Sequence, residues 1–199
     1  MPRRFTERGQ LRATELPCPA IPMNKVINVV VAGLGGQGVL KGTDILADAA
    51  LRAGYDVKKS EIKGMSQRGG SVTGDVRFGH RVFSPMVPGG EADFLLVLEL
   101  TQVAPHQYML RPGGVLITPD AVNANQLPSR KTLNVALLGA LSAHLPMAEE
   151  LWLTALRSGF GETFFADNQK AFILGRDGQK AAGLKRSDAG QPAPDTAKA

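Results

Sequence analysis

Hydrophobic and polar positions divide the chain into alternating strand-like and helix-like segments. The first is VINVVVAG at residues 26–33, a β-branched apolar run that is typical of a strand buried on both faces. A glycine-rich segment, GLGGQG, ends this strand, and after it the apolar residues recur at helical spacing as far as Gly54, which suits a helix end. The positions with this spacing are Val39, Leu46, Ala49, Ala50 and Ala53. The pattern predicts a buried strand, a tight turn and a helix.

Five more segments have the patterns of strands. YDVKKSEI at 55–62 precedes a second glycine-rich segment, KGMSQRGG. After it, SVTGDVRFG at 71–79 alternates between apolar and polar residues, which is typical of a strand with one solvated face or at a sheet edge. RVFSPMVP at 81–88 indicates a short strand that ends in a turn. ADFLLVLEL at 92–100 and VLITP at 115–119 indicate buried strands, with a short helix between them.

The C-terminal third has a helical texture. Its predicted helices are TLNVALLGALSAHL, AEELWLTALRS ending at Gly159, and ETFFADNQKAFIL ending at Gly175. The alternation before it predicts an α/β fold with three layers: a mainly parallel, Rossmann-like sheet with an antiparallel portion, followed by a helical C-terminal third.

The two ends of the chain lack these patterns. We expect residues 1–24 to form a disordered extension and 179–199 a disordered tail, with one domain over 25–178. Met23 directly precedes the first strand and is a second candidate for the first residue of the protein.

The net charge of +5 is confined to these ends. Residues 1–25 carry +3 and residues 176–199 carry +2, so the body over 26–175 is neutral. A neutral body argues against a surface that follows the phosphates of a nucleic acid. No apolar run approaches the ~20 residues of a membrane-spanning helix, and charges occupy the place of a signal peptide's apolar stretch. We therefore expect a cytoplasmic protein without nucleic-acid or membrane partners.

Cysteine and histidine set limits on redox and metal chemistry. Cys18 is the single cysteine, and one thiol cannot form an internal disulfide, hold an iron–sulfur cluster or complete a cysteine-rich zinc site. The three histidines, His80, His106 and His144, show no ligand spacing. We find no set of nucleophile, base and acid, and we expect no catalytic residue and no metal site in this chain.

The first glycine-rich segment matches a dinucleotide fingerprint. Gly33, Gly35 and Gly38 have the spacing G-x-G-x-x-G between a strand and a helix, and Glu61 lies where such folds place a ribose-binding acid. The same glycines also fit a tight turn without a ligand, a site for another anion, or a surface for a partner's backbone. Glycine spacing alone leaves these alternatives open.

Both glycine-rich segments together carry a more specific resemblance. GLGGQGV, SEIKGMSQRGGSV and FSPMVPGGEADFLLVLE, in this order, resemble the gamma-type domain of 2-oxoacid:ferredoxin oxidoreductases. GMSQRGGSV is similar to the indolepyruvate branch, in which this domain is a separate small subunit. NVALLGALSAHLP and NQKAFILGRDG resemble the family's closing helices, so the similarity runs from about Val26 to Gly178.

The resemblance implies a hetero-oligomer. A large partner subunit would hold thiamine diphosphate, Mg²⁺ and [4Fe-4S] clusters, while this chain holds no cofactor alone and is not catalytic alone. In such enzymes a thiamine carbanion attacks the 2-oxoacid substrate, carbon dioxide leaves, and electrons pass singly through the clusters to ferredoxin or another acceptor. Coenzyme A, where it is used, accepts the acyl group.

The resemblance also implies site residues, because in family members that hold coenzyme A with this domain the matching turns lie beside its phosphates. The first turn would contribute Gly35, Gly36, Gln37 and Gly38, and the second Ser66, Gln67, Arg68, Gly69 and Gly70. The other possibility is that the turns dock against the partner near its active site. A planar guanidinium such as that of Arg68 suits phosphate or carboxylate, and the alternative role of Arg68 is a loop-stabilising ion pair with Glu61 or with a partner carboxylate.

Three hypotheses remain from the sequence. The chain is a required small subunit of an indolepyruvate or other arylpyruvate oxidoreductase, a free-standing NAD(P)- or FAD-binding Rossmann oxidoreductase, or an interaction module whose glycines only shape turns. Lys58, Lys59 and Lys63 would extend a basic mouth or stand solvated at a strand end, and Glu99 would cap a helix or pair with a partner.

Overall fold

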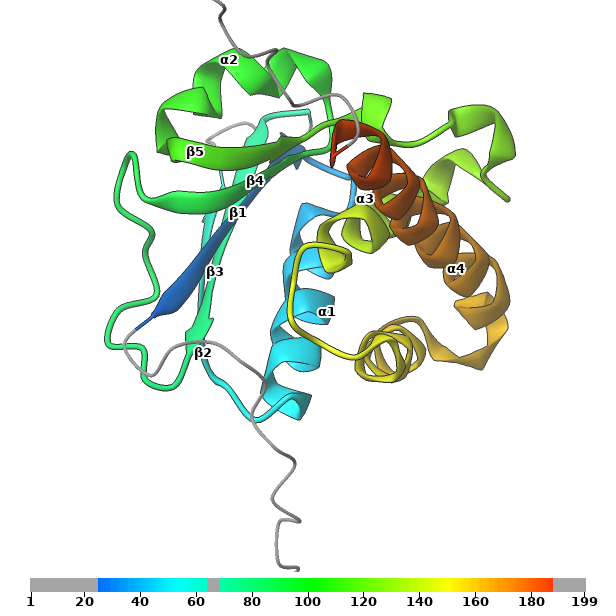
Figure 1. The fold of residues 1–199 in the computed structure, drawn as a ribbon, viewed down its shortest axis with the longest axis horizontal. Helices are drawn as coiled ribbons and strands as arrows, with labels where there is room; N and C mark the ends of the chain where they lie inside the picture. The colour runs from blue at the N-terminus through cyan, green and yellow to red at the C-terminus, as the bar shows by residue number, and fades with distance from the viewer. Residues whose placement is uncertain (1–24, 64–68, 188–199) are drawn as a thin grey trace, which may run out of the picture.

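The computed structural model describes residues 25–63 and 69–187 (Figure 1). The strands are β1 Val26–Leu34, β2 Asp56–Lys63, β3 Ser71–Gly79, β4 Ala92–Val97 and β5 Leu110–Ile117. The α-helices are α1 Val39–Arg52, α2 Val103–His106, α3 Leu133–Ser142 and α4 Glu149–Ser187. Five short 3₁₀ helices complete the described elements: η1 Leu100–Gln102, η2 Gln107–Met109, η3 Pro119–Ala121, η4 Ala124–Gln126 and η5 Arg130–Thr132.

The five strands form one mixed sheet in the order β2-β3-β1-β4-β5. β4 is parallel to β1 and β5 is parallel to β4, whereas β3 is antiparallel to both β1 and β2. Four strands therefore run in one direction and β3 alone runs in the other. The α/β fold class, with an antiparallel portion and a helical C-terminal region, is confirmed.

The long helices all lie on one side of the sheet (Figure 1). α1 packs against β1, β2 and β3, α3 packs against β4 and β5, and α4 packs across α1 and α3. Val29 and Val31 of β1 point into this core, which also contains Trp152 and Phe172 of α4. Val30 and Ala32 of β1 face the opposite way, into a smaller apolar cluster. The layers are thus the sheet, the α1–α3 layer and α4.

Residues 81–88 are irregular, so the short strand predicted there is wrong. The backbone of this segment does not pair with a neighbouring strand; it is bound by side chains of the sheet. The Arg77 guanidinium donates from Nη1 to the carbonyls of Ser84 and Met86, at 3.2 and 3.0 Å, and the Asp75 carboxylate accepts from the Val87 N–H at 2.9 Å. Pro85 and Pro88 lack the N–H that a ladder needs, so a strand was disfavoured.

Gly175 lies inside α4, so the helix end predicted there is wrong. The reason is the contact with α3: a Cβ on Gly175 would overlap the carbonyl oxygen of Ala136, and one on Gly139 would overlap that of Phe172. Glycine at these positions therefore lets the two helix backbones touch. The helical path does break near the predicted Gly159, at Gly161, where φ is 72° and ψ is 170°.

The helix also continues past residue 178, where we expected the domain to end. α4 reaches Ser187, and the segment QKAAGLK contains mostly strong helix formers. The predicted extension over 1–24 lies outside the described residues, as do positions 188–199 of the predicted tail.

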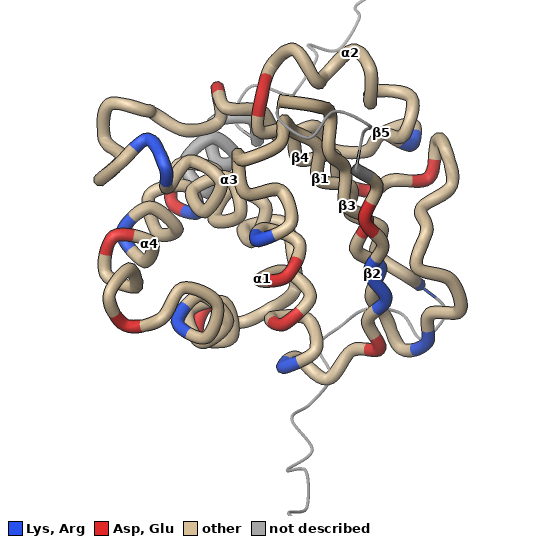
Figure 2. Tube along the Cα trace, turned by 180° about the vertical axis from the view of Figure 1, so that it is seen from behind, with Lys and Arg blue, Asp and Glu red and all other residues tan. Residues whose placement is uncertain are grey.

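Charged residues of both signs are intermixed along the described chain (Figure 2). On β2, Lys58 pairs with Asp56, and Lys59 pairs with Glu61 and with Asp44 of α1. Burial opposes the charged form of Lys59, but these two carboxylates raise its pKa above the ordinary value. Lys58 and Lys59 are therefore engaged along the edge strand and do not form a basic mouth.

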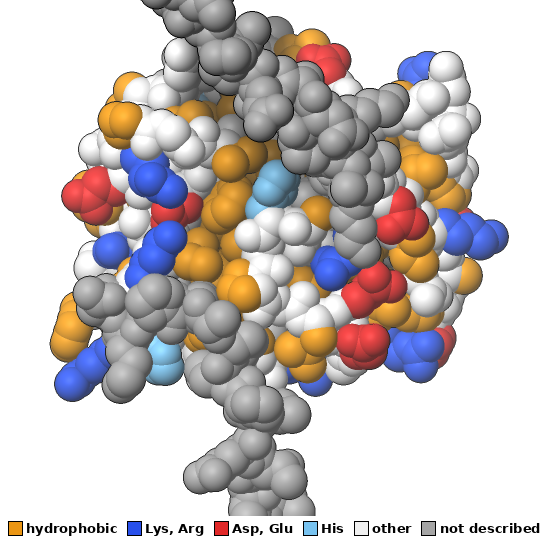
Figure 3. Space-filling model, in the orientation of Figure 1, with side chains coloured by type: hydrophobic (Ala, Val, Ile, Leu, Met, Phe, Trp, Pro, Cys, Tyr) orange, Lys and Arg blue, Asp and Glu red, His pale blue; other side chains and the backbone are white. Residues whose placement is uncertain are grey.

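Apolar side chains gather between the sheet and the helices on the face seen in Figure 3, with acidic and basic side chains spread around them. None of the helices in the described part of the chain combines the length and the apolar character needed to cross a membrane.

Candidate functional site

The two glycine-rich turns meet at one edge of the sheet. Leu34 at the end of β1 pairs with Ser71 at the start of β3, so the segments beyond these residues emerge side by side. The Gly35 N–H donates to the Gly70 carbonyl at 2.9 Å, and a Cβ on Gly35 would lie 3.5 Å from the Gly69 nitrogen. The structure thus brings both predicted turns together.

Three of the predicted site residues, Ser66, Gln67 and Arg68, lie outside the described residues. The remaining six fall at the meeting point of the turns or directly beside it: Gly35, Gly36, Gln37, Gly38, Gly69 and Gly70. Their role in holding a cofactor stays a prediction.

Gln37 fastens the first turn to the neighbouring strand. Its Oε1 accepts the Leu34 N–H at 2.8 Å, and its Nε2 donates to Oε2 of Glu99 at 3.2 Å. Glu99 follows β4. Its side chain does not cap the helix that follows it, but makes this contact with Gln37, and its pairing with a partner stays a prediction. The amide predicted to face a ligand is thus already used to shape the turn.

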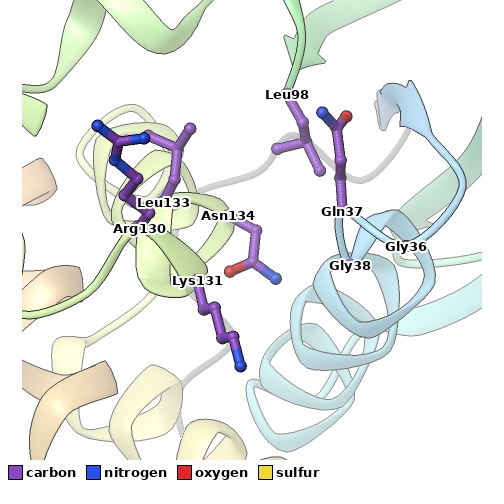
Figure 4. Close-up of a pocket in the computed structure, with 8 residues that line it drawn as sticks. All are labelled: Gly36, Gln37, Gly38, Leu98, Arg130, Lys131, Leu133 and Asn134. Atoms are coloured by element: carbon purple, nitrogen blue, oxygen red, sulfur yellow. The ribbon is translucent and has the colours of Figure 1, made fainter. Parts of the chain in front are cut away.

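A pocket of about 440 Å³ opens beside this turn (Figure 4). The chain leaves β1 toward β2 and β3 on one side, and it leaves β4 toward β5 on the other, so the gap between β1 and β4 is the switch point of the sheet. Ligands of such sheets bind at the carboxyl ends of the strands beside this point. The lining residues are Gly36, Gln37, Gly38, Leu98, Arg130, Lys131, Leu133 and Asn134.

Two cations on η5 form the wall opposite the glycine turn. Arg130 and Lys131 follow Ser129, whose Oγ accepts the Lys131 N–H at 3.3 Å and so caps this 3₁₀ turn. The lining contains no carboxylate to oppose these two charges. Neither residue was predicted from the sequence as part of the site. The available signal was a serine followed by two cations at the start of a predicted helix. This pattern marks the helix start in the sequence but does not show which part of the folded chain lies opposite it.

Asn134 reaches across from α3 toward the first turn of α1 (Figure 4). The Val135 N–H donates to its Oδ1 at 2.9 Å, so the amide nitrogen Nδ2 is the atom turned to Gly38. A Cβ on Gly38 would collide with that nitrogen. Gly38 also has a φ of 85°, a conformation that L side chains rarely adopt, so both space and backbone favour glycine here.

The start of α1 directly follows Gly38, one of the residues that line the same pocket. Gly38 precedes the helix and offers no side chain to cap it, and the first turn contains no acidic residue. The first N–H groups of a helix have no acceptor within it, and they lie at the positive end of its dipole. The pocket therefore combines backbone donors, a side-chain amide and two cations, a set that suits an anion.

A second hollow, of about 540 Å³, lies on the face of the sheet opposite the long helices α1, α3 and α4. His106 lines it and lies 3.0 Å from the Ser71 Oγ, and burial lowers the pKa of this histidine. Burial raises the pKa of Asp75 in the same hollow, partly opposed by its bond from Val87. Within the described residues no three His, Cys, Asp or Glu side chains gather where they could hold a metal ion.

These features define a Rossmann-like domain with an anion-suited pocket at the switch point of its sheet. The chain belongs to the pyruvate ferredoxin/flavodoxin oxidoreductase family, whose model matches residues 28–178.

Relatives with curated names come from archaea. Indolepyruvate oxidoreductase subunit IorB of Thermococcus kodakarensis is 45% identical over 104 residues, which are 52% of this chain and 50% of that protein. The subunit of the same name from Methanothermobacter thermautotrophicus is 28% identical and covers 78% of this chain and 97% of its own length. With the first of these the chain aligns over only about half of the relative's length.

Solved structures show the same fold. The gamma subunit of a keto/oxoacid ferredoxin oxidoreductase from Geobacter sulfurreducens superposes with a TM-score of 0.69 at 24% identity, covering 79% of this chain and 98% of that one. A 2-oxoglutarate:ferredoxin oxidoreductase from Magnetococcus marinus, solved with 2-oxoglutarate, coenzyme A and succinyl-CoA bound, superposes at 0.70 and 23% identity. The match covers 79% of this chain but 31% of the Magnetococcus chain.

Proposed function

We propose that this chain is the small subunit of a 2-oxoacid:ferredoxin oxidoreductase that acts on indolepyruvate or another arylpyruvate. The family match over residues 28–178 and the names of the archaeal relatives support this proposal. The observation that carries it is the contact between Gly35 and Gly70, because it joins the two motifs that resemble the gamma-type domain, the second of which is similar to the indolepyruvate branch, at one edge of the sheet.

The chain would complete the active site of a larger partner and would not act alone. That partner would hold thiamine diphosphate with Mg²⁺, which supplies the decarboxylation chemistry, and [4Fe-4S] clusters that pass electrons to ferredoxin. A [4Fe-4S] cluster takes four thiolates, and this chain has one cysteine, Cys18. The large subunit would therefore have to supply the cysteines that hold the clusters.

The role of the small subunit would be to shape and close one wall of the site. Backbone donors at Gly36 and Gly38 would face the substrate or the coenzyme, while Gln37 holds the turn in place through Leu34 and Glu99. Coenzyme A, where the reaction uses it, would contact both turns, including the predicted Ser66, Gln67 and Arg68.

Co-expression with the proposed large thiamine-binding subunit tests the proposal. A tagged version of this chain is expected to purify with the large subunit in a fixed ratio, and indolepyruvate-dependent reduction of ferredoxin is expected from the complex. Full activity of the large subunit without this chain would refute the requirement for it.

The alternative is a free-standing NAD(P)- or FAD-binding oxidoreductase, which the first glycine turn alone suggested. The sheet order disfavours it, because one strand, β3, lies between β1 and β2 and so separates Glu61 from the turn that follows β1. Glu61 also binds Lys59 at 2.7 Å. Calorimetric titration with NAD, NADP and FAD decides: we expect no heat, and saturable binding of any of the three would favour the alternative.

A further inference from the structure

We infer that the hollow on the face of the sheet opposite α1, α3 and α4 is a docking site for a protein segment that inserts an arginine side chain against Asp75. Strands β1, β2 and β3 contribute the floor of this hollow, and residues 84–89 and 106–109 contribute its walls. None of the lining residues in the described part of the chain belongs to a glycine turn or to the 440 Å³ pocket.

A buried carboxylate gives the hollow its charge. Asp75 lines the hollow and is only 4% exposed. Among the described residues it accepts one hydrogen bond, from the Val87 N–H to Oδ2, whereas an ionised carboxylate has about four acceptor positions. A buried carboxylate with so few partners is unfavourable in its charged form, and burial raises the pKa of Asp75 accordingly. A cation from outside the chain would use the remaining acceptor positions.

The described lining offers Asp75 no cation of its own, because it contains no lysine or arginine. Burial lowers the pKa of His106, which favours the neutral imidazole, and a serine hydroxyl already lies at hydrogen-bond distance from this ring. Arg77 is close enough to lower the pKa of Asp75, but its guanidinium donates to the Asn28 side chain and to two carbonyls of the 81–88 segment. The charge of the hollow is therefore complementary to that of a cationic ligand.

Exposed apolar side chains around the carboxylate indicate a protein ligand. Ile62, Met86 and Tyr108 line the hollow and are 51%, 56% and 68% exposed. Large apolar side chains that are exposed together are typical of surfaces that bind proteins, and tyrosine and methionine are enriched in such surfaces. The volume of about 540 Å³ has room for a long side chain together with an apolar neighbour.

Arginine is the cation that fits this lining best. Its guanidinium is more weakly hydrated than an ammonium, and it stacks on aromatic rings such as that of Tyr108. It also carries five N–H donors, which Asp75 and the hydroxyl of Thr73 in the same lining would accept.

The partner would be the large subunit, so the identity of the occupant rests on the proposed function. The hollow lies next to the edge where the two glycine turns meet. His106 lines the hollow and lies 3.0 Å from the Oγ of Ser71, which directly follows Gly70 of the second turn. A partner that contacts the turns would therefore reach this face without a break in the contact surface.

The experiment measures the affinity of the full-length chain for the purified large thiamine-binding subunit by biolayer interferometry. D75N keeps an oxygen for the Val87 N–H but removes the charge. It is expected to weaken the affinity by at least about 30-fold, as is usual when one member of a buried charge pair is removed. The matched control, D48N, removes a carboxylate of α1 on the other side of the sheet and should leave the affinity unchanged.

A second arm changes only exposed side chains. Y108A removes a tyrosine that is 68% exposed from the wall of the hollow, and we expect the affinity to weaken by about 10-fold. F164A removes an aromatic ring that is 64% exposed from α4, on the helix side, and should have no effect. Thermal unfolding of each variant without the large subunit checks that it is folded, and D75N should keep the wild-type unfolding temperature because its amide oxygen still accepts from Val87.

Wild-type affinity in both D75N and Y108A would overturn this inference and leave the proposed function standing. No complex between the wild-type chain and the large subunit would overturn the proposed function and, with it, the partner named here. A dimer of the isolated chain that D75N and Y108A both dissociate, measured by analytical ultracentrifugation, would show that a second copy covers this face. That result would also overturn the inference.

Discussion

The amide of Gln37 donates to the carboxylate of Glu99 at 3.2 Å and so fixes the distance between the ends of β1 and β4. The other end of the same amide accepts the Leu34 N–H at 2.8 Å. One side chain therefore joins the end of a strand, the glycine turn after it and the neighbouring strand. Because Gln37 is one of the residues that line the pocket, this contact ties the wall of the pocket to the end of β4.

Exchanging the amide and the acid tests this contact. Q37E keeps an oxygen for the Leu34 N–H but places a second carboxylate against Glu99, so we expect the free energy of unfolding at pH 7 to fall by about 1 kcal/mol. The double variant Q37E/E99Q restores an amide–carboxylate pair with the roles reversed. Urea unfolding of both variants is the measurement, and equal destabilisation of the single and double variants would show that the contact is unimportant.

The glycines at 36 and 38 form a matched pair. Both have positive φ, 94° and 85°, but a Cβ on Gly36 meets open space whereas one on Gly38 collides with Asn134. G36A should therefore destabilise the protein by roughly 1 kcal/mol, because alanine adopts a positive φ less readily than glycine. G38A should lose a further ~1–3 kcal/mol because of the overlap. Thermal unfolding compares them, and a smaller loss in G38A than in G36A would contradict the geometry.

A second pair of glycines tests the helix crossing. G175A would force a methyl group into the carbonyl of Ala136, so it should destabilise the protein by more than ~2 kcal/mol. In G178A the new Cβ would lie 3.8 Å from the Ala121 carbonyl, an ordinary contact. That variant should be neutral or more stable by up to about 1 kcal/mol because alanine favours helix. Chemical denaturation measures both, and similar losses in the two variants would rule out the close approach of α3 and α4.

His106 predicts the direction of a pH dependence. Burial lowers its pKa below the ordinary 6.5, so between 6.5 and the folded value the unfolded chain binds more protons than the folded one. Stability associated with His106 is therefore present above pH 6.5 and is lost as the pH falls below it. H106Q, which can still bond to Ser71, should show a smaller decrease in unfolding temperature between pH 7 and pH 5 than wild type. H80Q removes an exposed histidine as the control, and an equal change in H80Q would assign the effect elsewhere.

The sequence predicted those parts of the fold whose signal is local. The apolar run of β1, the glycine turn and α1 occur as the pattern indicated, because a two-sided buried strand and a helix have distinct periods. The meeting of the two turns was predicted from the family resemblance, and the antiparallel pairing of β1 with β3 explains it.

The parts that were missed depend on contacts between distant segments. Gly175 has the appearance of a helix end, and only the packing of α3 against α4 shows that it is a crossing point. Arg130 and Lys131 look like the start of an ordinary helix, and their place opposite Gly36 follows from the path of the chain after β5. Residues 81–88 contain apolar positions, but their backbone is bound by Arg77 and Asp75 from a strand that periodicity cannot identify as their partner.

The most direct test of the central claim is the rate of indolepyruvate-dependent ferredoxin reduction by the large subunit, measured with wild type, G35A or G35L as the small subunit. A methyl group on Gly35 fits beside Gly69, at 3.5 Å, whereas a leucine side chain would push the two turns apart. We predict full activity with wild type and G35A, and no activity from either subunit alone. With G35L we predict a loss of up to about 100-fold, because a small misplacement of a residue at an active site can lower the reaction rate by this factor. Equal rates with all three small subunits, or turnover by one subunit unaided, would contradict the account.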